Sequence, residues 1–252
     1  MSFHFSPKIV NNGLVLYVDA ANPKSFVSGS TTIYDLTSNN KNGVLTNGTD
    51  SNTNNKGGIL FDGINDYVTF GNSFNDVLSG VDKKFTCSCF FTPTSTGNQF
   101  LFGKYSDSAI SENGRQFGVF VRDLGTGFKL DVLYSLNLLS ANNNLIRTSS
   151  TLNVSKPNYV VVTYDATQPS TLEKFKIYIN GVLSPTTLVV VGGIGVIANG
   201  PAQFTLGSSV ASTGLSQRPF QGDIYSFSIY NRILSIDEIL QNYNTLKNRF
   251  GL

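Results

Sequence analysis

Short apolar segments that alternate with polar residues, and that turn residues separate, recur along almost the whole chain. Residues 159–164 (YVVVTY) form the clearest segment, because β-branched and aromatic side chains favour extended backbone. Asn180-Gly181 follows the alternating segment 174–179 and is typical of a two-residue hairpin turn. Period-two alternation with turns at roughly ten-residue intervals indicates an antiparallel two-sheet β-sandwich. The expected strands are 14–19, 33–36, 58–61, 67–70, 85–91, 100–104, 117–122, 128–133, 159–164, 174–179, 204–207 and 223–230.

The composition is compatible with one all-β domain. The chain has 252 residues, a length that single sandwiches commonly reach. Charged residues make up only 13%, so polarity comes mainly from Asn, Ser, Thr and Gly, which favour turns and loops. The sequence therefore predicts one domain over 13–252, preceded by an arm over 1–12.

Charge and hydropathy argue against two classes of partner. The net charge of +2 favours neither a nucleic acid nor an anionic membrane surface. No uncharged apolar run reaches the roughly 18 residues that a membrane span requires, so membrane insertion is not expected. Residues 1–8 also lack the basic-then-apolar order of a signal peptide.

The arm over 1–12 is apolar for a terminal segment. It contains Phe3, Phe5, Ile9 and Val10, while Pro7 interrupts regular strand pairing. Apolar side chains in a terminal arm are costly to leave in water. The arm is therefore expected either to fold back as an edge strand or to dock on a neighbouring subunit.

One helix is predicted, at the carboxyl end, over 235–250. Ser235 followed by Glu238 is a capping box, and Gly251 is suited to end a helix. The helix is expected to pack one apolar face on an edge or open end of the sheets, so that Leu240→Asp should place a charge beneath it. The side chains expected on that face are Ile236, Ile239, Leu240, Tyr243 and Leu246.

The segments between the strands give further expectations. Residues 46–57 and 137–153 are rich in Asn and Ser and are predicted to be surface loops. Segments 58–61 and 67–70 flank residues 62–66 and are predicted to pair as a hairpin.

Cys87 and Cys89 are the two cysteines of the chain. In a strand they lie on one face with Cα atoms about 6.7 Å apart along it and parallel Cβ vectors, which is unfavourable for a disulfide. A metal would need further ligands, and His4 is the single histidine. Two buried free thiols are expected, in a chain made in a reducing cytoplasm.

Three landmarks, in order along the chain, carry a family resemblance. They are Gly13–Ser25 with the later Tyr34-Asp35-Leu36, then Phe61–Val68, and finally Gly222-Asp223-Ile224 with 229–235. This pattern resembles laminin G-like, concanavalin A-like domains in structural proteins of tailed bacteriophages. The resemblance to phage proteins rests chiefly on 6–10 and 249–251. It implies a jelly-roll sandwich, a fold that serves lectins, adhesins, glycosidases and inert decoration alike.

The resemblance also bears on catalysis. Glycosidases of this fold use a Glu-x-Asp-x-x-Glu strand that pairs two carboxylates, and the chain has no such motif. Its three glutamates are Glu112 in a polar loop, Glu173 at the start of a hairpin strand, and the capping Glu238. A Ser-His-Asp arrangement would depend on His4 in the terminal arm. No catalytic residue is assigned, and the protein is not expected to be an enzyme.

No cofactor is expected either. Residues 192–195 (GGIG) precede neither a helix nor a Lys, so they predict a loop or bulge and not a phosphate cradle. Calcium-binding relatives carry paired acids just after the Gly-x-Ile step, and Tyr225 and Ser226 occupy those positions here. The resemblance therefore implies that this calcium site is missing.

Two other oxygen-rich clusters leave a structural calcium ion open, although it is not the favoured interpretation. Asp62, Asn65 and Asp66 could surround calcium, or they could hydrogen-bond the backbone of a tight turn, which we favour. Asp35 with Asn39 and Asn40 presents the same choice. The metal ligands stay unassigned.

A sugar-binding site would need an exposed aromatic ring with polar neighbours. Tyr105, Tyr134, Asn142 to Asn144 and Phe220 lie in segments that could be loops, and no feature singles one out. The sugar-binding residues stay unassigned.

These observations favour a non-enzymatic virion structural protein, such as a head decoration, capsid fibre or tail adhesin. Its expected partners are other virion proteins, further copies of itself and host-surface glycans. A carbohydrate-binding lectin module not tied to a virion is the alternative. A glycoside-active enzyme of the same fold ranks last.

Overall fold

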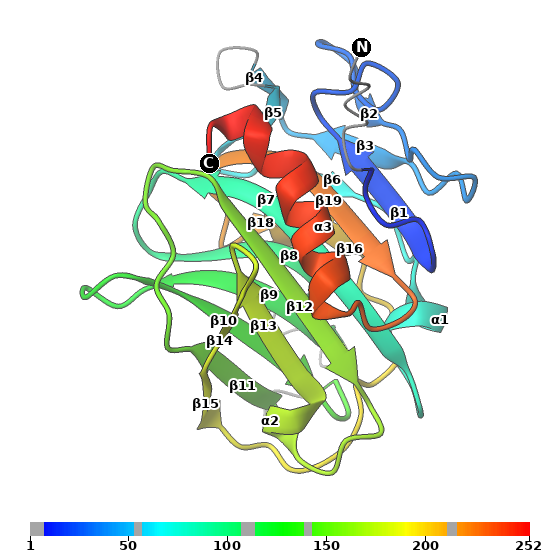
Figure 1. The fold of residues 1–252 in the computed structure, drawn as a ribbon, viewed down its shortest axis with the longest axis vertical. Helices are drawn as coiled ribbons and strands as arrows, with labels where there is room; N and C mark the ends of the chain where they lie inside the picture. Colours follow the sequence, from blue (N-terminus) through cyan, green and yellow to red (C-terminus); the bar gives the residue numbers. More distant parts are fainter. Residues whose placement is uncertain (1–7, 53–56, 107–113, 139–142, 211–215) are drawn as a thin grey trace, which may run out of the picture.

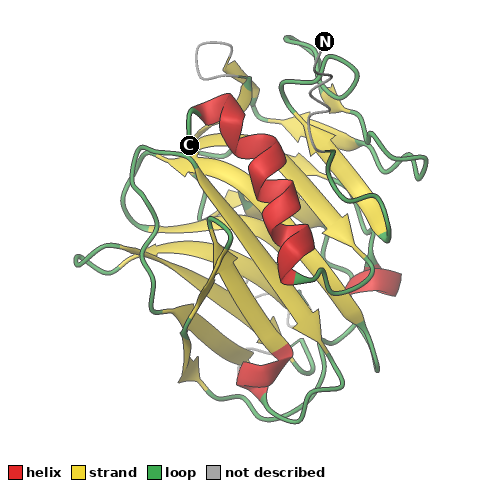
Figure 2. Cartoon of the chain, in the orientation of Figure 1, coloured by secondary structure: helices red, strands yellow, loops and turns green. Residues whose placement is uncertain are grey.

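In the computed structural model, two antiparallel sheets face each other across the main core (Figure 1). The structure describes residues 8–52, 57–106, 114–138, 143–210 and 216–252. Strands make up most of the regular structure (Figure 2). The predicted all-β jelly-roll sandwich with a carboxyl-terminal helix is confirmed. None of the helices in the described ranges is long and apolar enough to cross a membrane.

Sheet A has eight strands in the described residues, and β19 lies at its centre. The order is β14-β13-β12-β7-β19-β5-β4, and β1 pairs with the second half of β19. The strands are β1 (Leu14–Asp19), β4 (Asp50–Asn52), β5 (Gly58–Asp62), β7 (Lys84–Pro93), β12 (Asn158–Asp165), β13 (Phe175–Ile179), β14 (Val182–Ser184) and β19 (Gln221–Tyr230).

Sheet B has nine described strands, in the order β15-β11-β10-β9-β8-β16-β6-β3-β2. They are β2 (Thr32–Ile33), β3 (Gly43–Thr46), β6 (Tyr67–Thr69), β8 (Asn98–Tyr105), β9 (Arg115–Asp123), β10 (Phe128–Ser135), β11 (Asn143–Thr148), β15 (Thr186–Val190) and β16 (Phe204–Leu206). A small ribbon pairs β17 (Ser209–Val210) with β18 (Ser216–Gln217). The helices are α1 (Asn75–Leu78), α2 (Thr171–Lys174), α3 (Ile236–Lys247) and the 3₁₀ turn η3 (Asn248–Phe250).

Several local predictions from the sequence are confirmed. The turn Asn180-Gly181 joins β13 to β14, with both residues at positive φ, as a two-residue hairpin requires. Cys87 and Cys89 are free and fully buried in β7, where burial raises the pKa of both thiols.

Gly222 has a positive φ of 142°, and a Cβ there would lie 2.0 Å from the Thr92 carbonyl oxygen, so only glycine fits beside β7.

The predicted hairpin between 58–61 and 67–70 is wrong. β5 pairs with β19 and β4 in sheet A, whereas β6 pairs with β3 and β16 in sheet B. Phe61 and Val68 both point into the core between the sheets, so the turn between them carries the chain from one layer to the other.

The prediction of a loop over 137–153 is also wrong in its centre. β11 covers 143–148 and pairs with β10 and β15, because Leu145 and Ile146 are buried. In the other predicted loop, 46–57, residues 50–52 form β4 beside β5. Residues 53–56 and 139–142 lie outside the described residues.

Helix α3 lies across the outer face of sheet A (Figure 1). Ser235 and Glu238 form the predicted capping box, and Gly251 adopts the left-handed conformation after η3. The predicted apolar face is only partly right. Ile239 is fully buried and Tyr243 and Leu246 pack beside it, but Ile236 and Leu240 are 45% and 37% exposed. The buried face is rotated towards Asn242, so Leu240 lies at its margin and not beneath the helix.

Residues 8–12 pack against α3 without forming an edge strand. Val10 is buried, its N–H donates to Asn242 Oδ1 (2.8 Å), and its carbonyl accepts from the Tyr230 hydroxyl (3.0 Å). The Lys8 carbonyl accepts from Gln241 Nε2 (2.7 Å). This part of the arm folds back on its own domain. Residues 1–7, with Phe3, His4 and Phe5, lie outside the described residues, so docking by them stays a prediction.

Candidate functional site

The aromatic residues considered for sugar stacking are buried. Tyr105 ends β8 and its ring packs edge-on against Phe120 (5.2 Å between centroids). Tyr134 lies in β10, in the main core, and Phe220 packs edge-on against Phe61. None of the three can stack on a ligand. Tyr105 and Tyr134 lie in strands and not in loops as predicted, whereas Phe220 does precede β19 outside any strand but is buried all the same.

Of the asparagines considered with them, Asn144 has a structural role. Asn142 lies outside the described residues, and Asn143 is buried in β11. The Asn144 side chain accepts from Gly192 N–H (3.1 Å) and donates to the Gly193 carbonyl (3.0 Å). It thereby fixes the glycine segment 192–195 as a loop, as predicted, with no helix following it.

The 62–66 cluster forms the hydrogen bonds of a turn. Asp62 Oδ1 accepts from Ile64 N–H (2.7 Å), and Asp66 Oδ2 accepts from Asp62 N–H (2.9 Å). Asn65 contributes its backbone carbonyl, which accepts from Asn47 Nδ2 (3.0 Å). Burial raises the pKa of Asp66 above its ordinary value. The backbone hydrogen bonds expected of a turn are therefore present.

Asp35 organises its loop in the same way. Its Oδ1 accepts from the N–H groups of Tyr17 (3.1 Å) and Thr37 (2.9 Å), and its Oδ2 accepts from Lys41 N–H (3.0 Å). Asn39 donates to the Val15 carbonyl (2.9 Å) and not towards Asp35. Asn40 has a left-handed backbone (φ 54°) and donates to the Ser38 carbonyl. Within the described ranges, no three Asp, Glu, His or Cys side chains gather as a metal site would require.

Glu173 and Glu238 are engaged at helix starts. Glu238 forms two hydrogen bonds with Arg232 (2.7 and 2.8 Å), and this pairing, with the Ser235 N–H, lowers the pKa of Glu238 to about 2 against the opposing effect of burial. Glu173 lies in α2, not at the start of a strand as predicted, and accepts from the capping Ser170 hydroxyl (2.6 Å). Glu112 lies outside the described residues.

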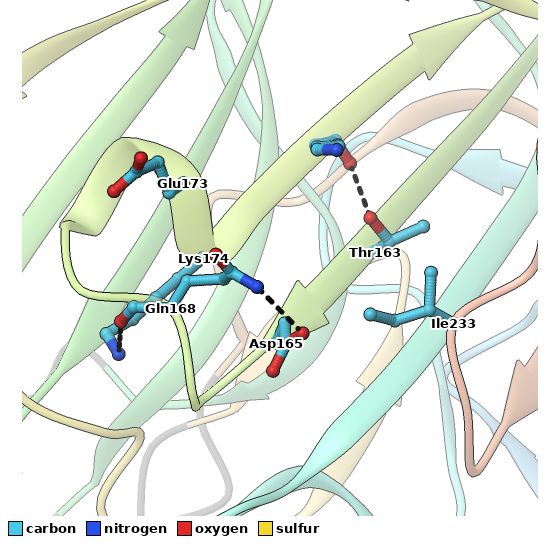
Figure 3. Close-up of a pocket in the computed structure, with 7 residues that line it drawn as sticks. Thr163, Asp165, Gln168, Glu173, Lys174 and Ile233 are labelled. Carbon is cyan, nitrogen blue, oxygen red and sulfur yellow. Dashed lines mark hydrogen bonds between the residues drawn. The ribbon is translucent and has the colours of Figure 1, made fainter.

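A polar groove opens on the outer face of sheet A, beside α2 and next to Ile233, which precedes α3 (Figure 3). Its volume is about 260 Å³. Thr163 and Asp165 point outward from β12, because they alternate with the buried core residues Val162 and Tyr164. The lining is Thr163, Asp165, Gln168, Glu173, Lys174, Lys176 and Ile233.

Hydrogen bonds hold the groove in shape. Lys174 is buried and its Nζ donates to the carbonyls of Ala166 and Gln168 (both 2.5 Å), which fixes the loop between β12 and α2. Gln168 Nε2 donates to Asp165 Oδ2 (3.2 Å), and Lys84 Nζ lies 3.1 Å from the same oxygen. The groove therefore has a rigid floor below more exposed polar groups.

The electrostatics of the groove centre on Asp165. Burial alone would raise the pKa of its carboxyl group. Hydrogen bonds from Thr167 and Gln168, together with Lys84, outweigh that effect and hold the pKa well below its usual range. Asp165 is thus a permanent carboxylate and hydrogen-bond acceptor at neutral pH. Lys176 supplies an exposed ammonium group on the neighbouring strand. Hydroxyl, amide, carboxylate and ammonium groups together can hydrogen-bond a polyhydroxylated ligand.

Sequence reasoning did not find this groove. Its residues come from β12, α2, β13 and the segment before α3, which are separate in the sequence. One signal was available in the sequence. In 159–164 and 174–179, polar residues alternate with apolar ones and should face outward; these polar positions include Lys176 and continue to Asp165.

The sequence of residues 61–240 matches the laminin G model of the concanavalin A-like lectin/glucanases superfamily. This match covers well over half of the chain. The protein belongs to that superfamily. No curated protein matches the chain.

Solved structures share the fold at low sequence identity. The binding domain of Paraclostridial Mosquitocidal Protein 1 matches with a TM-score of 0.64 and 16% identity, over 94% of this chain and 53% of that one. Trypanosoma rangeli sialidase in complex with sialic acid matches with a TM-score of 0.62 and 15% identity, over 94% of this chain and 33% of the sialidase. Domain 4 of the arabinanase AbnA from Geobacillus stearothermophilus, in complex with arabinotriose, matches with a TM-score of 0.59 and 15% identity, over 91% and 98% of the two chains.

Proposed function

We propose that this protein is a non-catalytic, lectin-like module that binds carbohydrate in the groove beside α2. The observation that carries the proposal is the composition of that groove: six of its seven lining side chains are polar, with Ile233 the apolar exception. Hydroxyl groups of a sugar can donate to the Asp165 carboxylate and accept from Gln168 and Lys176. The likeness to a whole domain in complex with arabinotriose supports carbohydrate as the ligand class.

The absence of catalysis is part of the proposal, and the chemistry of Asp165 supports it. A two-carboxylate glycosidase needs a general acid with a raised pKa that stays protonated near neutral pH. Asp165 is held ionised by its hydrogen bonds and Lys84. Glu173, the other carboxylate of the groove, accepts a hydrogen bond from Ser170 at the start of α2.

We further propose that the module is displayed on a virion, as a head decoration, capsid fibre or tail adhesin that contacts host-surface glycans. This part rests on the sequence resemblance of 6–10 and 249–251 to phage structural proteins. Mass spectrometry of purified particles tests it directly. Peptides of this chain at constant stoichiometry are expected, and their absence from particles made in cells that express the protein would contradict it.

A glycan array followed by calorimetry tests the binding function. The wild-type protein is expected to bind a defined set of glycans and to release no reducing sugar from them. Lys176→Ala and Gln168→Ala should weaken binding by about tenfold each, because each removes a donor that faces the ligand. Lys156→Ala, an exposed lysine outside the groove, is the matched control and should leave affinity unchanged. Sugar release that Asp165→Asn abolishes would overturn the non-catalytic proposal, and the absence of any glycan binding would overturn the lectin proposal.

A further inference from the structure

The outer face of sheet B carries an excess of positive charge on three neighbouring strands. Arg122 in β9, Lys129 in β10 and Arg147 in β11 point away from the core, because their sequence neighbours Val121, Leu130 and Ile146 are core residues. The strand register pairs Arg122 with Lys129 and Asp131 with Arg147. Three cations and one carboxylate therefore share a small area of this face.

Asp131 holds the two arginines in a fixed arrangement. Arg122 Nε donates to Asp131 Oδ2 (2.8 Å), and Arg147 donates through Nη2 to the same oxygen (2.8 Å) and through Nε to Oδ1 (2.7 Å). The Asp131 side chain is 1% exposed, whereas those of Arg122 and Arg147 are 32% and 21% exposed. The carboxylate lies beneath, and the guanidinium groups lie above it at the surface.

Three other ion pairs of the structure join Lys84 to Asp165, Arg232 to Glu238, and Arg249 to Asp19. At Asp131 one negative charge is shared by two arginines, so one positive charge is left over. Lys129, which donates to the Ser149 carbonyl, adds a second.

The arginines retain unused donors. Within the described part of the chain, Arg122 donates only through Nε and Arg147 only through Nε and Nη2, so both terminal nitrogens of Arg122 and Nη1 of Arg147 have no acceptor there. A guanidinium group matches the geometry of carboxylate and sulfate oxygens, and it loses little freedom on binding when it is already held in place.

We propose that Arg122, Arg147 and Lys129 form a second binding surface, which takes the sulfate or carboxylate groups of an acidic saccharide. The ligand class rests on the proposed lectin function, and the anion preference rests on the Asp131 cluster alone. A nucleic acid fits this surface less well, because the aromatic residues nearby on the face, Phe100 and Phe120, are buried and cannot stack on bases.

The test uses the full-length protein and four probes. They are a heparin hexasaccharide, a hyaluronan hexasaccharide, the neutral sugar maltohexaose and single-stranded DNA of matched charge. The double variant Arg122→Gln/Lys129→Gln removes two cations and leaves Arg147 paired with Asp131, so the fold is retained. Lys24→Gln/Lys156→Gln, which removes two exposed lysines elsewhere, is the matched control. Calorimetry gives affinities, and melting temperatures check folding.

The wild-type protein is expected to bind at least one acidic saccharide, less tightly as salt rises. Arg122→Gln/Lys129→Gln should weaken that binding by about tenfold or more, and the control by less than about twofold. Arg122→Lys should give an intermediate loss, because it keeps the charge but loses the fork of donors. An equal loss in the control, or DNA binding as tight as that of heparin, would overturn the proposal. If the protein binds maltohexaose or array glycans but no acidic saccharide, the second binding surface is overturned and the lectin proposal stands. If it binds no saccharide at all, both proposals are overturned.

Discussion

Asp66 stabilises the crossing between the two sheets through one carboxylate oxygen and buries the other. Its Oδ2 accepts from the Asp62 N–H, while its Oδ1 is buried and has no hydrogen-bond partner within the described residues. Burial and the nearby Asp62 carboxylate raise the pKa of Asp66 from its ordinary value of 3.8, although the Asp62 N–H opposes them. The charged form is therefore unfavourable in the folded protein relative to the unfolded chain.

Asp66→Asn should stabilise the protein at neutral pH, by about 2–4 °C in melting temperature. The amide keeps an acceptor for Asp62 N–H, and its NH₂ group can donate to the Asp62 carboxylate. Because the folded pKa is raised, the contribution of wild-type Asp66 to stability is fully present below the unfolded pKa. It is lost as pH rises through the folded pKa. The gain from Asp66→Asn should therefore be seen at pH 7 and vanish near pH 3, by thermal unfolding at both values.

Asp66→Ala is the control for this variant, because it removes the acceptor for Asp62 N–H and should destabilise the protein at both pH values. If Asp66→Asn is instead destabilising, and more so when calcium is present, the carboxylates of this turn bind a cation and the turn interpretation is wrong.

At the scale of elements, helix α3 is held by a face that includes a polar residue. Ile239 is fully buried against sheet A. Asn242, one turn later and 2% exposed, accepts from Val10 N–H and donates to the Tyr230 hydroxyl (3.0 Å). An apolar pattern alone cannot identify such a buried polar residue. The burial of Asn242 depends on Val10, which is more than two hundred positions away, and on Tyr230 in β19. This is why the predicted face included the exposed Ile236 and Leu240 and left out the buried Asn242.

Two neighbouring substitutions test this placement of the helix. Ile239→Asp should destabilise the protein by about 3–5 kcal/mol, since it buries an unpaired charge and leaves a void beneath α3. Leu240→Asp should cost about 1 kcal/mol or less, because Leu240 is 37% exposed at the margin beside Gly181. Denaturant unfolding measures both. Equal losses at the two positions would mean that the helix is rotated relative to the structure described above.

Predictions of individual elements succeeded where the local sequence determines the backbone conformation. They failed where the outcome depends on which of the two sheets a segment joins. The strand over 159–164 and the Asn180-Gly181 turn depend on intrinsic backbone preferences and on adjacent pairing, and both were predicted. The 62–66 turn was predicted, but its role as a crossing between sheets was not, because hairpin and crossing turns use the same residue types. Leu145 and Ile146 were hidden within the polar segment 137–153.

At the scale of the whole molecule, the fold was predictable from landmarks spread along the chain, but neither proposed binding surface was. The groove and the arginine cluster each combine side chains from several strands. Arg122, Asp131 and Arg147 meet only because the register of β9, β10 and β11 aligns them. Alternation predicts that such residues face outward, but it contains no information on which of them become neighbours.

Residues 8–12 connect the start of the chain to its last helix, so removing them should weaken the whole domain. Deletion of residues 2–11 removes Val10 from its buried site, its two hydrogen bonds with Asn242 and Tyr230, and the bond from Gln241 to Lys8. Unpaired buried polar groups and lost apolar contacts should lower the melting temperature by about 5–10 °C.

Deletion of residues 2–7 separates this contribution from docking. It retains Lys8 and Val10, so the melting temperature should change by less than about 2 °C. If residues 1–7 dock on a neighbouring subunit, this shorter deletion alters the oligomeric state in light scattering, or incorporation into particles, while the domain stays equally stable. If both truncated proteins have the melting temperature of the wild type, the contacts of residues 8–12 with α3 do not stabilise the domain. If deletion of 2–7 accounts for the whole loss of stability, the stabilising contacts belong to the first seven residues and not to Val10.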